Sequence, residues 1–337
     1  MVTLEQIKSV MIGHAIGDAL GVPVEFRGRD YLRKHPVTDM LGYGTYPVPA
    51  GAWSDDTSMS LATLDALIKN TVDYNDIMDN FTDWYVLGKY TPTDTVFDIG
   101  GTCRQAIENY RQGQGKPALE CGLSDENANG NGSLMRIHPM CLYLNAKGIS
   151  TKNAFEMIHN TSALTHAHMR SKIACVIYSY FLEELLKEPD RFSLYTALRR
   201  ILNEYVRQNI SFNHDEGAAH DRECEKYRHL IFRTCGYFSH WLDDFEPVKE
   251  SEIKSGGYVV DTLEAAMFCL LRTHSFEECV LKAVNLGDDT DTTAAVAGGL
   301  AGALYGYDAI PEKWKKQLIR KEYIEDLCEQ AFAAWVK

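Results

Sequence analysis

The sequence predicts an all-α fold in one domain over residues 1–337. Apolar residues recur at the three- and four-residue spacing of a helix along nearly the whole chain. Strict alternation of apolar and polar residues, which indicates strands, is nearly absent, and no strand–helix repeat occurs. No low-complexity linker divides the chain. We therefore expect functional residues on the loops between helices and at helix N-termini.

The elements follow from this pattern in order. The first helix is expected to begin at Thr3, where Gln6 completes a capping box, and to end at about Leu20. A loop rich in Gly, Pro and Tyr follows over about 42–53, and the acidic, poorly patterned stretch 243–254 is expected to be a mobile surface loop. Later helices are expected at about 57–69, 74–89, 101–111, 133–145, 151–163, 168–187, 191–208, 219–240, 258–272, 276–285, 292–305 and 311–335.

The composition is that of a soluble globular protein, with 45% hydrophobic and 24% charged residues. The formal net charge of −13 argues against non-specific binding to nucleic acid or to an anionic membrane. No segment has the pattern of a signal peptide or of a membrane span. We expect a cytoplasmic monomer. The nine cysteines lack regular spacing, and four lie within apolar helical patterns as expected for reduced core residues: Cys103, Cys175, Cys269 and Cys279.

Two short carboxylate clusters lie towards opposite ends of the chain. Residues 54–57 are Ser-Asp-Asp-Thr, and residues 288–292 are Asp-Asp-Thr-Asp-Thr. Each follows a loop that contains glycine and opens an Ala/Leu-rich stretch with a helical pattern. This repeated arrangement indicates that folding brings two helix N-termini to one point. Because several carboxylates at one point repel each other without a cation, and because oxygen ligands suit Mg²⁺, Mn²⁺ or Ca²⁺, the sequence predicts a metal-dependent enzyme.

The spacing within each cluster agrees with the first turn of a helix. Inside a helix, Asp289 and Asp291 would diverge by about 200°, and Asp55 and Asp56 by about 100°. Both members of a pair can face one ion only in the irregular first turn, where the helix dipole also favours anions. The alternative for each cluster alone is a plain N-cap, a position that Ser and Asp often fill. Two such clusters in one chain favour the metal site.

The segment 13–21 has three glycines at four-residue spacing, which predicts close contact between two helices. Asp18 lies in the middle of this segment and is not readily explained as a surface residue. Glu25 follows among apolar residues, where burial would raise the pKa of its carboxyl group unless a cation stabilises the anion. Glu25 is therefore a candidate general base or metal-linked acid, and the alternative is an ion pair with Arg27 or Arg29.

Four further segments could carry chemistry. Residues 129–136, Asn-Gly-Asn-Gly-Ser-Leu-Met-Arg, form a polar loop running into a helix, and its backbone N–H groups could bind a phosphate or form an ordinary turn. His166 and His168 are an unfavourable pair for one metal on a helix, but one of them could contact a ligand. Asp98 is an isolated acid in a loop that enters a helix. Tyr258 precedes a helix, either as a core residue or as a lid or stacking residue.

Together these segments resemble the ADP-ribosylglycohydrolase family, which includes the dinitrogen-reductase-activating glycohydrolase and the eukaryotic ADP-ribosylhydrolases. The resemblance covers nearly the whole chain. Seven segments occur in the order that is typical of the family: GHAIGDALGVPVEF, WSDDTSM, FDIGGT, NGNGSLMR, LTHAH, GYVVDTLEAA and NLGDDTDTTAAVAGGLAGALYG.

The resemblance implies a compact orthogonal helical bundle with two divalent cations, Mg²⁺ or Mn²⁺, in a cleft at helix N-termini. Asp288 departs from the family pattern because many members have glycine there, and we expect its side chain to point away from the ions. Gly101 stands where some relatives have a side-chain amide, which weakens any inference about the leaving group. The implied metal ligands are Ser54, Asp55, Asp56, Asp289, Asp291 and Thr292; the implied catalytic residues are Glu25 and Asp98; the implied substrate-binding residues are Gly130, Asn131, Gly132, Ser133, Met135, Arg136, His166 and Tyr258.

The implied activity is metal-dependent removal of ADP-ribose from modified proteins by water attack at the anomeric carbon. Two metals can hold the ribose hydroxyls and lower the pKa of a water molecule, whose proton Glu25 could accept. Asp98 is a candidate for protonating the leaving group. An acid and an aromatic face, Asp98 and Tyr258, suit a guanidinium group, so ADP-ribosyl-arginine is the expected substrate, with serine- or other O-linked ADP-ribose as the alternative. The expected partners are an ADP-ribosylated protein and the product ADP-ribose.

Three other functions are less consistent with the sequence. A class I terpenoid synthase uses Asp-Asp-x-x-Asp motifs, but Met59 stands where the third Asp would be. A phosphatase with an Asp-x-Asp-x-Thr nucleophile needs a buried strand before the motif and a doubly wound domain after it, and the all-α pattern of this sequence predicts neither. A non-catalytic ADP-ribose-binding or crystallin-like relative would be favoured by a missing metal ligand, and all six implied ligands are present.

Overall fold

The computed structural model describes residues 2–113, 115–149, 151–200, 221–227 and 248–336. This part of the chain is built from helices and contains no β-strand. Its β-type backbone pairing consists of two isolated bridges, Leu123 with His166 and Gly130 with Tyr258. The prediction of an all-α fold is therefore confirmed.

Most helices lie where the sequence pattern predicts them, and the helical residues 221–227 lie within the helix predicted over 219–240. Short 3₁₀ turns follow or connect them at Val22–Val24, Ala118–Glu120, Glu250–Glu252 and Tyr307–Ala309. The α-helices are α1 (Leu4–Gly21), α2 (Arg29–Lys34), α3 (Asp55–Ile68), α4 (Tyr74–Leu87), α5 (Gly101–Gln112), α6 (His138–Lys147), α7 (Thr151–Ala163), α8 (Met169–Lys187), α9 (Arg191–Arg200), α11 (Val259–Arg272), α12 (Phe276–Val284), α13 (Thr290–Tyr305), α14 (Glu312–Gln317) and α15 (Lys321–Trp335).

The prediction of a helix beginning at residue 133 was wrong. The helix α6 begins only at His138, and residues 132–136 form turns. Pro139 lies in the first turn of α6, where its missing N–H is tolerated. The helix expected over 311–335 is divided into α14 and α15 at Arg320, which has a left-handed φ of 53°. The short helix α2 was not predicted. Residues 201–208, 219–220, 228–240 and 243–247 of the predicted elements lie outside the described residues.

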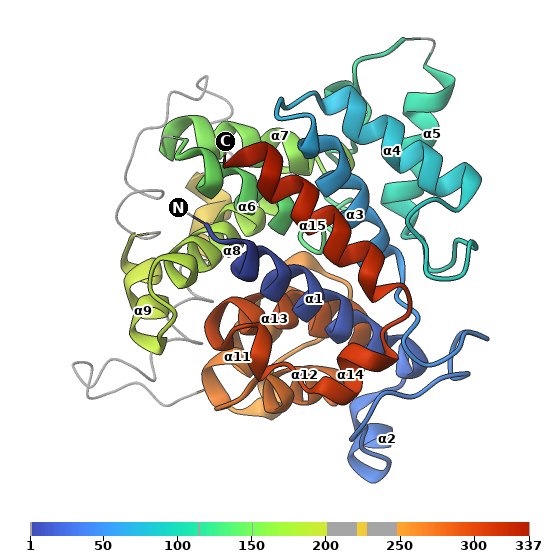
Figure 1. Ribbon diagram of the computed structural model, residues 1–337, viewed down its shortest axis with the longest axis vertical. Coiled ribbons are helices and arrows are strands. Elements are labelled where there is room, and N and C mark those ends of the chain that lie inside the picture. Colours follow the sequence, from blue (N-terminus) through green and yellow to red (C-terminus); the bar gives the residue numbers. More distant parts are fainter. Residues whose placement is uncertain (1, 114, 150, 201–220, 228–247, 337) are drawn as a thin grey trace.

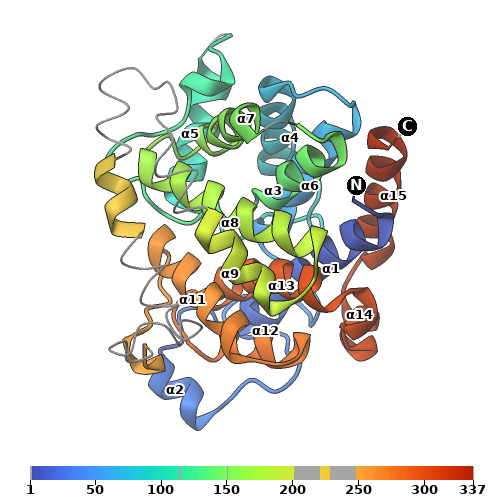
Figure 2. The ribbon, with the colours of Figure 1, turned by 90° about the vertical axis from the view of Figure 1, so that its left-hand side faces the viewer.

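The helices α1 and α13 form the centre of the molecule, where they pack backbone against backbone (Figure 1). A methyl group on Gly17 would lie 2.0 Å from the carbonyl oxygen of Ala294 in α13, and one on Gly13 would lie 2.5 Å from that of Gly298. The glycine spacing in 13–21 therefore serves the close helix contact that it predicts. The other helices surround this pair, with α11 and α12 on one side and α3, α6 and α8 on another (Figure 2).

The same contact positions the second carboxylate cluster. A methyl group on Gly21, the last residue of α1, would lie 2.3 Å from the backbone N of Asp291 in the first turn of α13. Thr290 Oγ1 also donates a 2.8 Å hydrogen bond to the carbonyl oxygen of Gly21. The C-terminus of α1 and the N-terminus of α13 are thus fixed side by side. Glu25 follows α1 by one short 3₁₀ turn and so lies beside the cluster.

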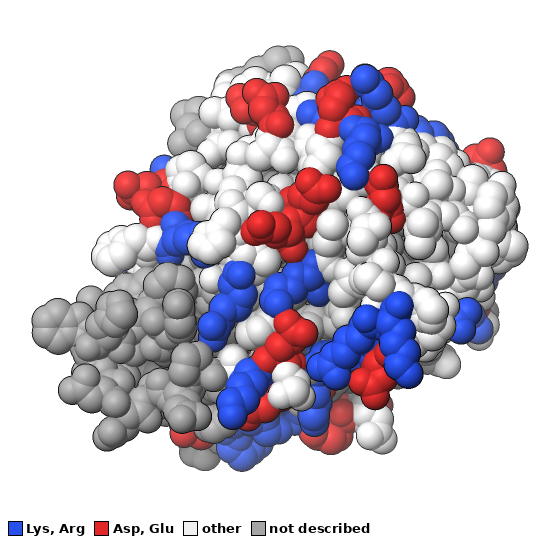
Figure 3. All heavy atoms as spheres, turned by 90° about the horizontal axis from the view of Figure 1, so that it is seen from below, with Lys and Arg blue, Asp and Glu red and all other residues white. Residues whose placement is uncertain are grey.

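The core is apolar, and the four predicted core cysteines, Cys103, Cys175, Cys269 and Cys279, are buried and free. Among the described helices, none combines the length and apolar character needed to cross a bilayer. On the face seen in Figure 3, Lys and Arg side chains are interspersed with Asp and Glu. Ion pairs such as Lys313 with Asp39 at 3.4 Å belong to this kind of mixed surface.

Candidate active site at two helix N-termini

The two carboxylate clusters meet in the folded chain. Ser54 caps α3, where its side chain accepts a hydrogen bond from the backbone N of Asp56. Asp289 occupies the capping position of α13. Thr292 Oγ1, in the first turn of α13, donates a 3.2 Å hydrogen bond to Asp56 Oδ2, in the first turn of α3. The sequence prediction that folding brings two helix N-termini to one point is confirmed by this contact.

Glu25 joins the point where the clusters meet. One oxygen atom each from Glu25, Asp289 and Asp291 lies within 4.8 Å of the others. Phe26 N donates to the carbonyl oxygen of Asp288 at 2.7 Å, and Asp288 N donates to that of Arg27 at 2.9 Å, so the two loops are held together by their backbones. Asp288 itself is exposed and has a left-handed φ of 63°, which Asp tolerates better than most residues. This geometry explains why glycine suits that position.

Several of these carboxylate oxygens are buried without a hydrogen-bond donor from the described residues. Burying an anion without a partner is costly, so such oxygens require either a proton or a cation. Their hard oxygen chemistry and their number fit a divalent cation. The oxygens concerned are Glu25 Oε2, Asp56 Oδ1, Asp289 Oδ1, Asp291 Oδ1 and Asp291 Oδ2.

When no cation is bound, burial and the neighbouring acids raise the pKa values of these carboxyl groups. Burial, followed by the charge of nearby Asp98, raises the pKa of the Glu25 carboxyl group to about 9. Burial raises the pKa of Asp56 and Asp291 well above the usual range, and neighbouring carboxylates add to the shift. The pKa of Asp55 is raised for the same two reasons. A bound divalent cation would reverse these shifts by stabilising the anions.

Asp18, for which the sequence suggested no role, holds the first cluster in place. Its buried carboxylate accepts hydrogen bonds from the backbone N of Ser54 at 2.9 Å, from the backbone N of Thr57 at 3.0 Å and from Thr57 Oγ1 at 2.6 Å. Asp18 therefore caps α3 from the neighbouring helix α1 and offers both carboxylate oxygens to the protein. The signal available in the sequence was an acid within the glycine-spaced segment 13–21, for which a close helix contact is predicted.

The loop 129–136 is tied to the second cluster through Asn131. Asn131 Nδ2 donates to Asp289 Oδ2 at 2.8 Å and to Thr262 Oγ1 at 2.9 Å. Asn131 N donates to the carbonyl oxygen of Gly257 at 3.0 Å, and Val259 N donates to that of Asn129 at 3.1 Å. The loop thus lies against the start of α11 and fixes the orientation of the Asp289 carboxylate.

His166 lies beneath the two glycines of this loop. A methyl group on Gly132 would lie 2.9 Å from His166 Cε1, and one on Gly130 would lie 3.5 Å from His166 Nε2. His166 Nδ1 is hydrogen-bonded to Thr165 Oγ1 at 2.8 Å. Burial lowers the pKa of His166 to about 3, so its ring is neutral at physiological pH. Three of the predicted substrate-binding residues, Gly130, Gly132 and His166, therefore lie next to one another.

Other predicted substrate-binding residues of the loop direct their side chains into the protein. The buried guanidinium group of Arg136 donates to Thr161 O at 3.2 Å and to Thr165 Oγ1 at 2.7 Å. Ser133 Oγ accepts a 2.9 Å hydrogen bond from Ser162 Oγ, and the Met135 side chain is buried. These side chains support the loop from inside, so a ligand on its outer surface would meet backbone groups.

Asp98 and Tyr258 approach the site from two other loops. Asp98 is half-buried, has a left-handed φ of 54° and lies close enough to Glu25 to raise the pKa of that acid. Tyr258 is 37% exposed and caps α11, with its ring 5.7 Å from the guanidinium carbon of Arg170. Arg170 is held in turn by Glu126 at 2.7 Å and Glu223 at 2.8 Å. Tyr258 is thus a partly exposed aromatic residue on a rigid support.

A model of the ADP-ribosylglycohydrolase family matches residues 2–337. The chain belongs to this family. It is 31% identical, over 98% of its length and 80% of the relative's, to ADP-ribosylarginine hydrolase Tri1 of Serratia proteamaculans. It is 30% identical to the ADP-ribosyl-[dinitrogen reductase] glycohydrolase of Rhodospirillum rubrum, over 92% of this chain and 89% of the relative. A solved structure described as an ADP-ribosylglycohydrolase-related protein complex has a TM-score of 0.75 at 28% identity and covers 99% of each chain.

This ADP-ribosylglycohydrolase is accordingly a glycosidase that acts on ADP-ribose, and the resemblance found in its sequence is confirmed. The fold of the solved relative also confirms the predicted helical architecture.

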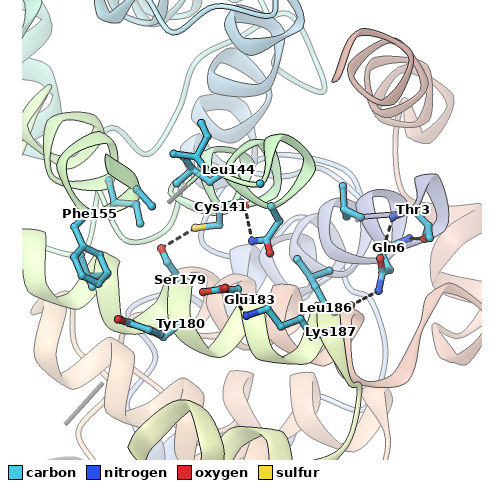
Figure 4. A pocket seen from close by; sticks show the side chains of 17 residues that line it. Thr3, Gln6, Cys141, Leu144, Phe155, Ser179, Tyr180, Glu183, Leu186 and Lys187 are labelled. Carbon is cyan, nitrogen blue, oxygen red and sulfur yellow. Dashed lines mark hydrogen bonds and ion pairs between the residues drawn. The ribbon is translucent and has the colours of Figure 1, made fainter. Parts of the chain in front are cut away.

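A separate cavity of about 610 Å³ lies between α6, α7 and α8, beside the first turn of α1 (Figure 4). Phe155, Leu144 and Leu186 form part of its apolar wall, and Cys141 and Ser179, whose side chains are 2.8 Å apart, form part of its polar wall. None of the predicted site residues of the ADP-ribosylglycohydrolase lines this cavity. The cavity is therefore separate from the acid cluster.

Sequence reasoning missed Tyr46, a half-buried residue of the loop before α3. Its hydroxyl group lies next to the carboxyl groups of Glu25 and Asp98. The loop is rich in Gly, Pro and Tyr, and nothing in that pattern distinguishes Tyr46 from Tyr43. The difference is tertiary, since Tyr43 is 74% exposed.

Proposed function

We propose that this ADP-ribosylglycohydrolase is a metal-dependent hydrolase that releases ADP-ribose from modified proteins by water attack at the anomeric carbon. The observation that carries the proposal is the convergence of Glu25, Asp289 and Asp291, with oxygen atoms within 4.8 Å of one another, at a point where Asp56 also contributes an unpartnered oxygen. Such a group of buried carboxyl groups must be either protonated or balanced by cations, and divalent cations would keep it ionised at neutral pH.

Two divalent cations, Mg²⁺ or Mn²⁺, would be held by six residues from the two helix N-termini. When bound, the cations would lower the pKa of a water molecule and polarise the ribose hydroxyls. The oxygen donors of the site suit these ions better than softer metals. The proposed ligands are Ser54, Asp55, Asp56, Asp289, Asp291 and Thr292.

The remaining steps belong to the protein's own side chains. Glu25 would orient the attacking water and accept its proton as the bond to the anomeric carbon forms. The leaving group would depart with the electrons of the glycosidic bond, and we propose that Asp98 supplies its proton. The backbone of Gly130–Gly132, supported by Ser133, Met135 and Arg136, would bind the phosphates, and His166 would lie beneath the distal ribose. Holding the sugar in place lowers the entropic part of the barrier.

We propose ADP-ribosyl-arginine as the preferred substrate. The acid Asp98 and the partly exposed ring of Tyr258 offer a charge-assisted hydrogen bond and an aromatic face to a planar guanidinium. The relatives from Serratia proteamaculans and Pseudomonas putida, at 31% and 30% identity, are ADP-ribosylarginine hydrolases. Human ADP-ribosylhydrolase ARH3 is 23% identical over 93% of this chain. The higher identity to the arginine-directed relatives supports the arginine linkage.

Release of ADP-ribose from matched arginine- and serine-modified peptides should test the substrate. With Mg²⁺ or Mn²⁺ present, we expect faster release from the arginine peptide, and chelation of the metal should abolish release from both. Faster cleavage of the serine peptide would overturn the arginine preference and leave the metal proposal intact. No release from either peptide, with ADP-ribose still bound in calorimetry, would favour the non-catalytic binding protein.

Replacing Asp18 by asparagine should weaken binding of Mn²⁺ about 10- to 100-fold, the usual effect of losing a residue that orients metal ligands. An amide has one acceptor oxygen, whereas the Asp18 carboxylate accepts three hydrogen bonds from Ser54 and Thr57. Calorimetric titration with Mn²⁺ measures the change, and the matched control is Asp30→Asn, an exposed acid whose side chain is 90% accessible. An unchanged Mn²⁺ affinity in Asp18→Asn would show that Asp18 does not position the ligands.

A further inference from the structure

Tyr46 lies against the two acids to which the proposed function assigns proton transfer. Burial, followed by the negative charges of Asp98 and Glu25, raises the pKa of its hydroxyl group above the usual value. The hydroxyl therefore keeps its proton throughout the physiological pH range and is a hydrogen-bond donor beside two carboxyl groups. Like-charged carboxylates repel at short distance, and a donor between them reduces that repulsion.

The backbone of the loop fixes Tyr46 relative to Glu25. Thr45 Oγ1 donates a 2.7 Å hydrogen bond to the carbonyl oxygen of Glu25, and Thr45 N donates to that of Pro23 at 2.9 Å. The loop also touches this segment closely at Gly44, where a methyl group would lie 1.8 Å from Pro23 O. Because Gly44 and Thr45 are both held against the segment that carries Glu25, the backbone fixes where the Tyr46 side chain begins.

The ring of Tyr46 makes a second connection, to the segment that carries Asp98. The ring centroids of Tyr46 and Phe97 are 4.9 Å apart, with an interplanar angle of 43°. Phe97 directly precedes Asp98, whose left-handed φ of 54° is sparsely populated for a residue with a side chain. The aromatic pair therefore stabilises an unusual backbone conformation that directs Asp98 towards the site.

We propose that Tyr46 is a positioning residue whose hydroxyl group hydrogen-bonds the carboxyl groups of Glu25 and Asp98 and keeps both directed at the glycosidic bond. This inference rests on the proposed function, in which Glu25 and Asp98 act on opposite sides of that bond. The hydroxyl orients the two acids, and the ring against Phe97 orients the hydroxyl. Tyr46 takes no part in binding the cations.

The test separates the hydroxyl group from the ring. Tyr46→Phe keeps the ring contact and removes the hydroxyl, whereas Tyr46→Leu removes both, and Tyr43→Phe is the matched control on the same loop. We expect kcat for the arginine peptide to fall about 10- to 100-fold in Tyr46→Phe, in line with the cost of a misplaced catalytic group. KM and Mn²⁺ affinity should stay within about twofold of the wild type, and the pH dependence of kcat should change. A Tyr46→Phe variant with wild-type kcat and pH profile would overturn the proposal. In that case, a defect seen only in Tyr46→Leu would show that the ring matters and the hydroxyl does not.

A crystal structure of Tyr46→Phe gives a readout that does not depend on activity. We expect the Glu25 and Asp98 carboxyl groups to rotate away from each other while the loop and the Phe97 contact remain. Unchanged carboxyl positions would overturn the positioning role, even if the enzyme cleaved another linkage. If the wild type releases no ADP-ribose from any peptide, the proposed function fails, and this structural comparison still decides the role of Tyr46.

Discussion

Replacing Asp291 by asparagine should abolish ADP-ribose release and should also stabilise the metal-free protein. Both oxygens of the Asp291 carboxylate are buried without a donor from the described residues, and one lies within 4.8 Å of oxygens from Glu25 and Asp289. Asparagine removes a charge with little change in volume. Because cation-assisted catalysis contributes several kcal/mol, and each 1.4 kcal/mol is a tenfold change in rate, we expect a loss of at least about 1,000-fold.

The stabilising effect follows from the direction of the pKa shift. Burial and neighbouring acids raise the pKa of Asp291 well above its usual value in the folded, metal-free protein. Between the unfolded and folded pKa values the folded chain holds more protons than the unfolded chain, so the free energy of unfolding falls as the pH rises. Replacing the carboxylate by an amide removes this decrease in the free energy of unfolding at neutral pH. The variant should therefore melt at a higher temperature than the wild type when divalent ions are chelated, and the difference should shrink near pH 4.

Thermal melts with and without Mn²⁺, combined with peptide turnover, measure both effects. The wild type should gain stability on adding Mn²⁺, and the variant should gain much less, because ligand binding to the folded state is linked to stability. Asp288→Asn is the matched control, since it makes the same chemical change at an exposed neighbour that tolerates the left-handed conformation. Full turnover in Asp291→Asn with unaltered Mn²⁺ binding would exclude Asp291 as a metal ligand.

The meeting of the acid clusters was predictable because its signals are local. Ser54 and Asp289 are recognisable as helix N-caps from their own residue types and immediate neighbours. Glycines at four-residue spacing within a helix indicate close contact with another helix. The late start of α6 also had a local signal in Pro139, which prefers the first turn of a helix. Such features depend on residue type and spacing within a few positions.

Other parts of the site depend on contacts between distant irregular segments. Asn131 reaches Asp289 from a loop far away in the sequence, and Tyr46 reaches Glu25 and Asp98 from a loop whose composition indicates only turns. The break between α14 and α15 has no Gly or Pro, and Arg320 there donates a 2.7 Å hydrogen bond to the carbonyl oxygen of Thr91. These contacts depend on how the whole chain folds, so the hydrophobic periodicity of the sequence does not predict them.

Replacing Gly17 by alanine should destabilise the protein strongly, although alanine is the better helix former. Alanine in place of glycine inside a helix contributes about 1 kcal/mol in its favour. Against this, the new methyl group would lie 2.0 Å from the carbonyl oxygen of Ala294 and 2.9 Å from the backbone N of Ala295, and a backbone cannot move aside as a flexible side chain can. Separating α1 from α13 would also disturb the contact at Gly21 that places Asp291 beside Glu25.

Overpacking a core commonly costs about 1–3 kcal/mol and more when backbone must shift, which is a large part of the 5–15 kcal/mol that stabilises an ordinary protein. We therefore expect a lower yield of folded protein, a melting temperature reduced by about 1–2 °C for each kcal/mol lost, and weakened Mn²⁺ binding in the fraction that folds. Gly28→Ala is the control, because a methyl group there has no heavy atom within 4 Å. A Gly17→Ala variant that melts with the wild type would mean that α1 and α13 can separate freely, and the two halves of the acid cluster would then need another element to hold them together.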